Sequence, residues 1–292
     1  MKSSDGDKFR ELAKQQQSQG KPEYAIELLN EAISLYQQVY GPIHSEIGSC
    51  LSDLSLLYYQ SEDIVQAISH QERALIIGER IHGLDSAEVA RHYTNLSVLH
   101  YAQDNTPLAL CFMARARYLH AVIFGTNHPE TVTSESNIAL MLQTLGHFKE
   151  AHERLLLVVA VEEQYFGPDN LVTAIGYHAL AKSCGLLGEF KAGLTFERLV
   201  YDVYLQKYGA DDPRTKESSL WMNQLAQNAV LLEKAKKESP QWSQRPDNKK
   251  ALPPNSVLVL PPAASSSSAP KPPASSNTTG GSQGSKGKGK KK

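Results

Sequence analysis

The residues best suited to chemistry in this 292-residue chain are ten histidines and three cysteines. Such side chains could hold zinc, which takes four nearby nitrogen, sulfur or carboxylate ligands. However, Cys50, Cys111 and Cys184 lie far apart in the sequence and form no C-x-x-C pair. His147 and His152 are five residues apart, so they do not share a helical face well. We therefore predict structural histidines, buried thiols and no metal site.

No other group of side chains forms a catalytic or cofactor-binding pattern. The glycines show neither the G-x-G-x-x-G order nor the P-loop order that cradles phosphates. No nucleophile stands with a base at a recognisable spacing. The sequence therefore predicts that the chain is not an enzyme and binds no cofactor.

A second kind of chemistry is electrostatic and belongs to the C-terminal end. Residues 239–292 carry nine Lys or Arg and one acid, whereas the rest of the chain carries 21 basic and 30 acidic side chains. A flexible polycation neutralises phosphates without reading sequence. The candidate polyanion-binding residues are Lys286, Lys288, Lys290, Lys291 and Lys292. A solubilising terminus is the alternative. The acidic body should repel RNA unless Arg91, Arg115 and Arg117 form a basic patch.

Residues that recur every 42 positions define the elements that must position these groups. The glycines are Gly41, Gly83, Gly125, Gly167 and Gly209; small residues recur at Ala25, Ala67, Ala109, Ala151 and Gly193; apolar residues recur at Leu12, Leu54, Leu96, Ile138 and Leu180. Within each unit, apolar residues follow helical spacing on both sides of a polar turn. Each unit is therefore predicted to be a helix-turn-helix of the tetratricopeptide type, with helices longer than in the usual repeat of about 34 residues.

The ends of the predicted helices carry their expected capping residues. Each repeating glycine suits the position after a helix, where φ is positive. Three residues later come the predicted N-caps of the next helix, His44, Ser86, His128, Asn170 and Asp212.

The predicted fold is an all-α, right-handed superhelical solenoid with a disordered tail. Residues 1–6 are a disordered start, residues 7–238 form five hairpins and a capping helix, and residues 239–292 are a disordered Pro/Ser/Gly/Lys-rich tail. No signal peptide and no run of about 18 apolar residues is visible, so we expect a cytoplasmic chain without membrane insertion. The N-terminal hairpin has no capping helix, which favours the C-terminal part of a larger protein. The oligomeric state is not predicted.

In such solenoids the first helix of each hairpin lines the inner, concave surface. Side chains there that are not needed for packing are candidates for binding. They are Asp53, Arg91, Thr94, Asn95, Val98, Tyr101, Ser136, Asn137, Leu140, His178 and Lys182. Asn side chains both donate and accept hydrogen bonds, so this surface suits an extended peptide. A solvated inner face is the alternative.

Several segments of the middle repeats resemble the repeat region of the clustered-mitochondria protein family. They are Gln71–Arg80 (QERALIIGER), Gly83–Ser86 (GLDS), His92–Leu96 (HYTNL), Arg115–Leu119 (RARYL), Phe124–Glu130 (FGTNHPE) and Ser136–Leu140 (SNIAL). The resemblance extends over about Tyr24 to Tyr208. The 42-residue period with its aromatic-Gly-x-x-His-Pro link also resembles the kinesin light chain type of repeat.

The first resemblance implies a large, multidomain cytosolic family that binds messenger RNAs for mitochondrial proteins. It also implies a role in distributing mitochondria and an association with the translation initiation machinery. The family's N-terminal and central domains are absent here. The alternative is a kinesin-light-chain-like adaptor that holds peptide motifs of cargo or partner proteins, although no heptad coiled coil precedes the repeats.

Overall fold

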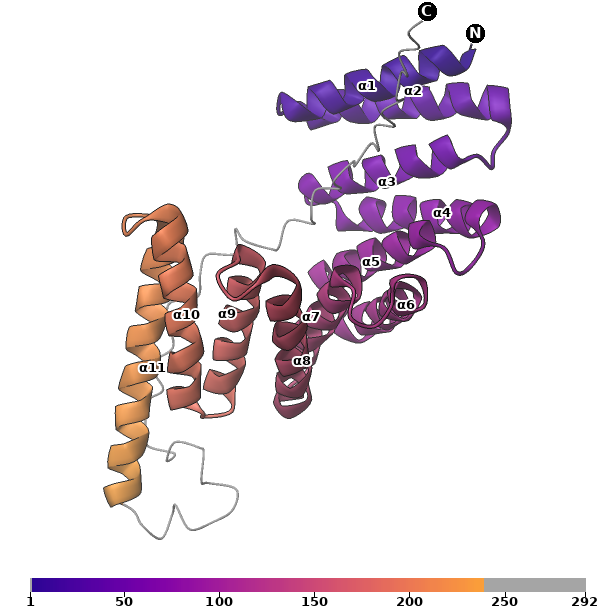
Figure 1. The fold of residues 1–292 in the computed structure, drawn as a ribbon. Helices are drawn as coiled ribbons and strands as arrows, with labels where there is room; N and C mark the ends of the chain where they lie inside the picture. Colours follow the sequence, from indigo (N-terminus) through magenta and orange to yellow (C-terminus); the bar gives the residue numbers. More distant parts are fainter. Residues whose placement is uncertain (1, 239–292) are drawn as a thin grey trace, which may run out of the picture.

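The computed structural model describes residues 2–238, which form eleven helices and, within that range, no strand (Figure 1). The helices are α1 (Lys2–Ser18), α2 (Pro22–Tyr40), α3 (Ser45–Gln60), α4 (Ile64–His82), α5 (Ala87–Ala102), α6 (Thr106–Phe124), α7 (Pro129–Thr144), α8 (Phe148–Phe166), α9 (Leu171–Leu186), α10 (Phe190–Tyr208) and α11 (Pro213–Glu238). Successive hairpins stack in chain order along an open arc. The predicted all-α solenoid is confirmed, including the closing helix.

Local capping chemistry sets the ends of the helices, as the sequence predicts. Gly41 has φ 82°, and its N–H donates to the carbonyl of Gln37. On the far side of the link, the side chain of Asn170 accepts from the N–H of Val172 at 2.9 Å. All five repeating glycines have positive φ, and all five predicted N-cap side chains accept a backbone N–H.

Small residues allow the two helices of each hairpin to touch. Ala25, Ala67, Ala109 and Ala151 are fully buried. The fifth residue of this series is Gly193, where an added Cβ would lie 3.1 Å from the carbonyl of Ala181. A larger side chain at these positions would therefore separate the helices.

At the interfaces between hairpins, a large side chain packs against a small residue. The helix that carries the large side chain differs between repeats. The pairs are Gly78 with His92, His120 with Ser134, and Glu162 with Gly176. An added Cβ at Gly78 would lie 3.0 Å from His92 Cδ2. His92 is buried and contacts Gln71 and Ser52 through its Nδ1 atom. Each interface therefore keeps its volume by placing a large side chain against a small one.

The first helix corrects the predicted N-terminal boundary. The sequence predicts a disordered start over residues 1–6, but α1 begins at Lys2. The reason is a contact that the sequence did not reveal: Gly6 is buried, and an added Cβ would lie 2.8 Å from the Tyr36 ring. The Tyr36 hydroxyl also donates to Asp7 at 2.6 Å. Residue 1 and the tail, residues 239–292, lie outside the described residues.

Helix α6 has the length and hydropathy of a membrane-spanning helix, the one such case among the described helices. In the structure, its Ala109, Met113 and Leu119 are fully buried, packed against residues of the neighbouring helices α5 and α7. Arg115 and Arg117 also interrupt its sequence. A core helix of a solenoid can have the same length and hydropathy, so these two properties do not indicate insertion into a membrane.

Candidate functional site

The odd-numbered helices approach one another along the inner side of the arc. Their side chains bridge directly from one odd helix to the next. Arg10 of α1 donates to Asp53 of α3 at 3.1 Å, and Tyr101 of α5 lies 3.0 Å from Thr144 of α7. At the far end, Lys182 of α9 lies over the Trp221 ring of α11. Because helices on the inner side of a curved stack lie closer together, these contacts place the odd helices there.

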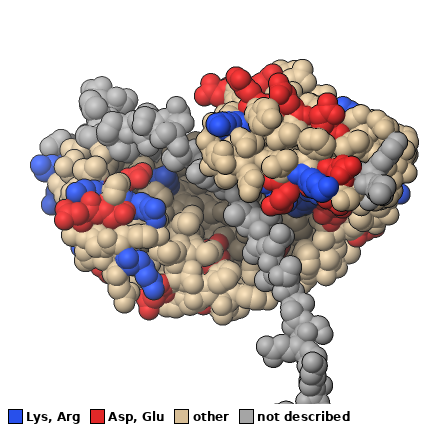
Figure 2. All heavy atoms as spheres, turned by 90° about the horizontal axis from the view of Figure 1, so that it is seen from above, with Lys and Arg blue, Asp and Glu red and all other residues tan. Residues whose placement is uncertain are grey.

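The molecule is hollowed between its two ends, and the visible part of the hollow is mostly uncharged (Figure 2). Lys, Arg, Asp and Glu gather in mixed clusters around its rim. A surface with few charges favours hydrogen bonds and apolar contacts over ion pairing.

The central candidates are accessible side chains of α5 and α7. Asn95 and Asn137 occupy equivalent positions, are half-buried, and make no side-chain hydrogen bond within residues 2–238. Val98 is half-buried, and Leu140 is exposed. Two further α5 candidates are engaged: Thr94 donates to the carbonyl of Ala90, and Tyr101 pairs with Thr144. Ser136, one residue before Asn137, is also half-buried.

Three other predicted residues, Asp53, Arg91 and His178, also have partners within the protein. Asp53 shares Arg10 with Glu46, and Arg91 pairs with Glu88 in the preceding turn of α5. His178 Nδ1 lies 2.8 Å from Glu197 Oε2.

Trp221 of α11 is a functional candidate that the sequence analysis did not assign to the groove. Its ring meets His178 edge-on at 6.0 Å and lies 5.5 Å from the ammonium group of Lys182. The signal available in the sequence was a tryptophan in the closing helix, where the repeat pattern ends. Trp221 thus closes the inner row at its C-terminal end.

The arginines considered as a basic patch are neutralised by acids. Arg115 pairs with Asp85 at 3.2 Å, and Arg117 pairs with Glu135 at 2.6 Å. Arg91 pairs with Glu88. The predicted polyanion-binding residues, Lys286, Lys288, Lys290, Lys291 and Lys292, lie outside the described residues.

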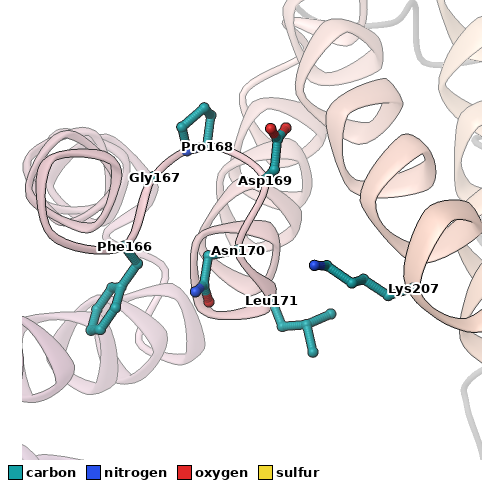
Figure 3. A pocket seen from close by; sticks show the side chains of 7 residues that line it. All are labelled: Phe166, Gly167, Pro168, Asp169, Asn170, Leu171 and Lys207. Atoms are coloured by element: carbon teal, nitrogen blue, oxygen red, sulfur yellow. The ribbon is translucent and has the colours of Figure 1, made fainter.

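Two pockets lie near the link between α8 and α9. The larger, of about 420 Å³, is formed by Phe166–Leu171 and Lys207 of α10, whose amino group points toward the link (Figure 3). The smaller, of about 150 Å³, includes Glu162, Val132 and Tyr165. Glu162 Oε2 is buried without a hydrogen-bond partner in the described chain, and burial raises the pKa of this carboxyl to about 7. The sequence does not predict this group, because nothing along the chain marks Glu162 as buried.

Three potential metal ligands converge near the turn of the last hairpin. His152 of α8, Cys184 of α9 and Glu189, the residue before α10, have ligand atoms within 4.8 Å of one another. Cys184 is buried, and the other two residues are half-buried. Spacings along the chain do not predict this cluster, because its residues come from three separate elements.

Comparison with known proteins agrees with this fold. Models of the tetratricopeptide repeat match residues 8–75 and 89–130. A solved structure of a putative kinesin light chain from Podosopora anserina, with nearly identical TPR-like repeats, superposes with a TM-score of 0.62 over 71% of this chain and 98% of that one, at 18% identity. BtubC (BKLC) from P. vanneervenii gives a TM-score of 0.63 at 15% identity, over 82% of this chain and 96% of that one. At these identities the likeness is one of fold.

Sequence relatives give a more specific result. The chain is 33% identical over 237 residues to the human clustered mitochondria protein homolog, a match that covers 81% of this chain and 18% of that protein. The Coccidioides immitis homolog is 35% identical over 220 residues, covering 75% of this chain and 17% of that protein. The chain therefore spans less than a fifth of these relatives' length. It is a tetratricopeptide-repeat solenoid whose sequence is related to the clustered mitochondria proteins.

Proposed function

We propose that the chain holds an extended segment of a partner protein in the hollow lined by α5, α7 and α9. The observation that carries this proposal is the pair Asn95 and Asn137. They stand one repeat apart on adjacent odd helices, and neither amide is used for hydrogen bonding within the described chain. A row of free amides can bond the backbone of an extended peptide at both donors and acceptors.

The apolar side chains beside the amides complete the binding surface. Val98 and Leu140 are accessible on the same two helices, and Leu140 is 39% exposed. They would contact apolar side chains of the peptide, while the asparagines bond its backbone. Trp221 bounds the surface at α11, so the segment would run across the odd helices toward the C-terminal end.

The test selects peptides from a random displayed library on the full chain and measures their affinity by fluorescence anisotropy. Asn95→Ala and Asn137→Ala should each weaken binding about tenfold, since one or two hydrogen bonds are worth about 1.4 kcal/mol. Asn30→Ala on α2 is the matched control, because Asn30 is exposed and lies on an even helix. The proposal is refuted if Asn30→Ala weakens peptide binding as much as the other two variants do. It is also refuted if neither Asn95→Ala nor Asn137→Ala weakens the binding of any selected peptide.

We propose a cytoplasmic role for this scaffold in the distribution of mitochondria, associated with messenger RNA and the translation initiation machinery. The support is the sequence relationship to clustered mitochondria proteins. As the match covers less than a fifth of these relatives, the RNA contact need not lie in this segment. Within this chain, the lysine-rich end is the favoured contact, because Arg91, Arg115 and Arg117 are paired with acids.

The RNA contact is tested by filter binding of several single-stranded RNAs across a salt series. The comparison is between the full chain and a variant with Lys286, Lys288, Lys290, Lys291 and Lys292 changed to Gln. Five neutralised phosphates on a single strand give a log–log salt slope of about −3.5, which the variant should lose. Unchanged binding in the variant, with a sequence preference, would place RNA binding in the repeats. Absence of RNA binding by the full chain, together with peptide binding, would favour the adaptor alternative.

A further inference from the structure

The strongest unassigned feature is the cluster of His152, Cys184 and Glu189. An imidazole nitrogen, a sulfur and a carboxylate oxygen lie within 4.8 Å of one another. Zinc accepts all three kinds of ligand. We propose that these three side chains bind a zinc ion at the junction of α8, α9 and the turn before α10.

The repeats of the same chain show that His152 departs from the packing pattern. The equivalent residues of the other four hairpins are all apolar: Ile26, Ile68, Leu110 and Leu194. An aliphatic side chain is therefore sufficient for packing at this position. A histidine here costs apolar contact and gains a metal-ligating nitrogen beside the Cys184 sulfur.

Glu189 stands at the N-cap of α10, and its side chain makes no capping hydrogen bond. Most hairpins do not need a capping side chain at the position of Glu189, because its equivalents Lys21, Asn105 and His147 make no capping hydrogen bond either. The exception is Asp63 at the N-cap of α4, whose side chain accepts the N–H of Gln66 at 3.1 Å. The longer Glu189 side chain instead reaches the sulfur of Cys184 and the ring of His152.

The surroundings suit a zinc ligand set. The buried Ser183 hydroxyl lies 3.2 Å from Nδ1 of His152 and fixes the orientation of the ring. Outer hydrogen-bond partners of this kind hold metal-binding histidines in place. On binding, the Cys184 thiol releases its proton to water, and the neutral imidazole binds through a lone pair. The ligand atoms must draw together slightly to reach distances of about 2.0–2.3 Å to the ion, and water fills the fourth tetrahedral position.

The test measures zinc binding to the full, untagged chain under reducing conditions, by competition with a chromophoric chelator. Cobalt binding is followed separately through the sulfur-to-metal charge-transfer absorbance. We expect one ion per chain, a cobalt spectrum with a thiolate band, and a higher melting temperature with zinc. Cys184→Ser should abolish the thiolate band, and Glu189→Gln should weaken zinc binding at least tenfold.

His152→Leu removes the histidine ligand in a variant that should still fold, because Leu occupies the equivalent position in two other hairpins. It should keep the helical circular dichroism of the parent and lose zinc binding. Cys111→Ser is the matched cysteine control, since Cys111 is exposed on α6, and it should leave both the affinity and the band unchanged. The proposal is overturned if the parent binds no stoichiometric zinc, or if His152→Leu and Cys184→Ser bind zinc as tightly as the parent.

Discussion

Glu162 offers the sharpest test of how the hairpins pack. Its side chain is 8% exposed, and its Oε2 atom lies against Gly176 on the next helix without a hydrogen-bond partner in the described chain. Burial raises the pKa of the carboxyl from 4.5 to about 7. At about 1.4 kcal/mol per pKa unit, ionising it in the folded state costs about 3 kcal/mol.

The raised pKa of Glu162 determines the direction in which stability changes with pH. The folded protein holds the proton more tightly than the unfolded chain, so the contribution of Glu162 to stability is complete below about pH 4.5. It is lost as the pH rises through about 7. His92 acts in the opposite direction, because burial lowers its pKa to about 4 and stability is lost as the pH falls from 6.5. The stability of the parent alone is therefore a poor measure of Glu162.

Comparison with Glu162→Gln isolates the effect, since Gln has nearly the same shape and does not ionise. Urea unfolding of both proteins from pH 4.5 to 8 should show free energies of unfolding within about 1 kcal/mol at pH 4.5. Between pH 4.5 and pH 8, the free energy of unfolding of the variant should rise by about 3 kcal/mol relative to that of the parent. Glu153→Gln, an exposed change on the same helix, is the control and should show no such trend. A difference that stays constant with pH would refute the buried, unpaired placement of Glu162.

Three further predictions concern the stack. Gly78→Ala should cost about 1–3 kcal/mol in urea unfolding, because the new methyl meets the fixed His92 ring; an unchanged midpoint would contradict that contact. Ala67→Arg or Ala109→Arg should unfold or loosen the solenoid, seen as a lower melting temperature, whereas Cys111→Arg on the exposed face of α6 should not. Glu62→Gly should raise stability by about 1 kcal/mol, because Glu62 has φ 62° at a position where three other hairpins have glycine; a loss of stability would contradict the strain expected at Glu62.

The sequence was sufficient for features that depend on one repeat unit. The glycine ends, the N-caps and the small residues inside each hairpin are determined by residues close in the chain. His44 caps α3, and Ala67 is fully buried, as their positions predict. The start of α1 was missed because it depends on Gly6 meeting Tyr36, which lies on the next helix.

The groups that bear chemistry were harder to predict because they depend on the placement of one hairpin against the next. Nothing near Glu162 in the sequence shows that it faces Gly176. His152 and Cys184 are separated by 32 residues and meet only when α8 packs on α9. Trp221 joins the inner row because α11 continues the series of odd helices. These contacts follow from the curvature of the stack and not from a local pattern.

The claim that an extended segment lies across the odd helices is tested most directly by photo-cross-linking. A benzophenone amino acid is placed at Asn95, at Asn137, and at the exposed Asn30 on α2 as the control. Each labelled chain is irradiated with a labelled peptide selected on the parent. Covalent adducts are expected from the probes at positions 95 and 137, mapped to different positions along one peptide, and none from the probe at position 30. Adducts from position 30 as strong as those from the two inner positions, or none from the inner positions despite binding, would contradict the claim.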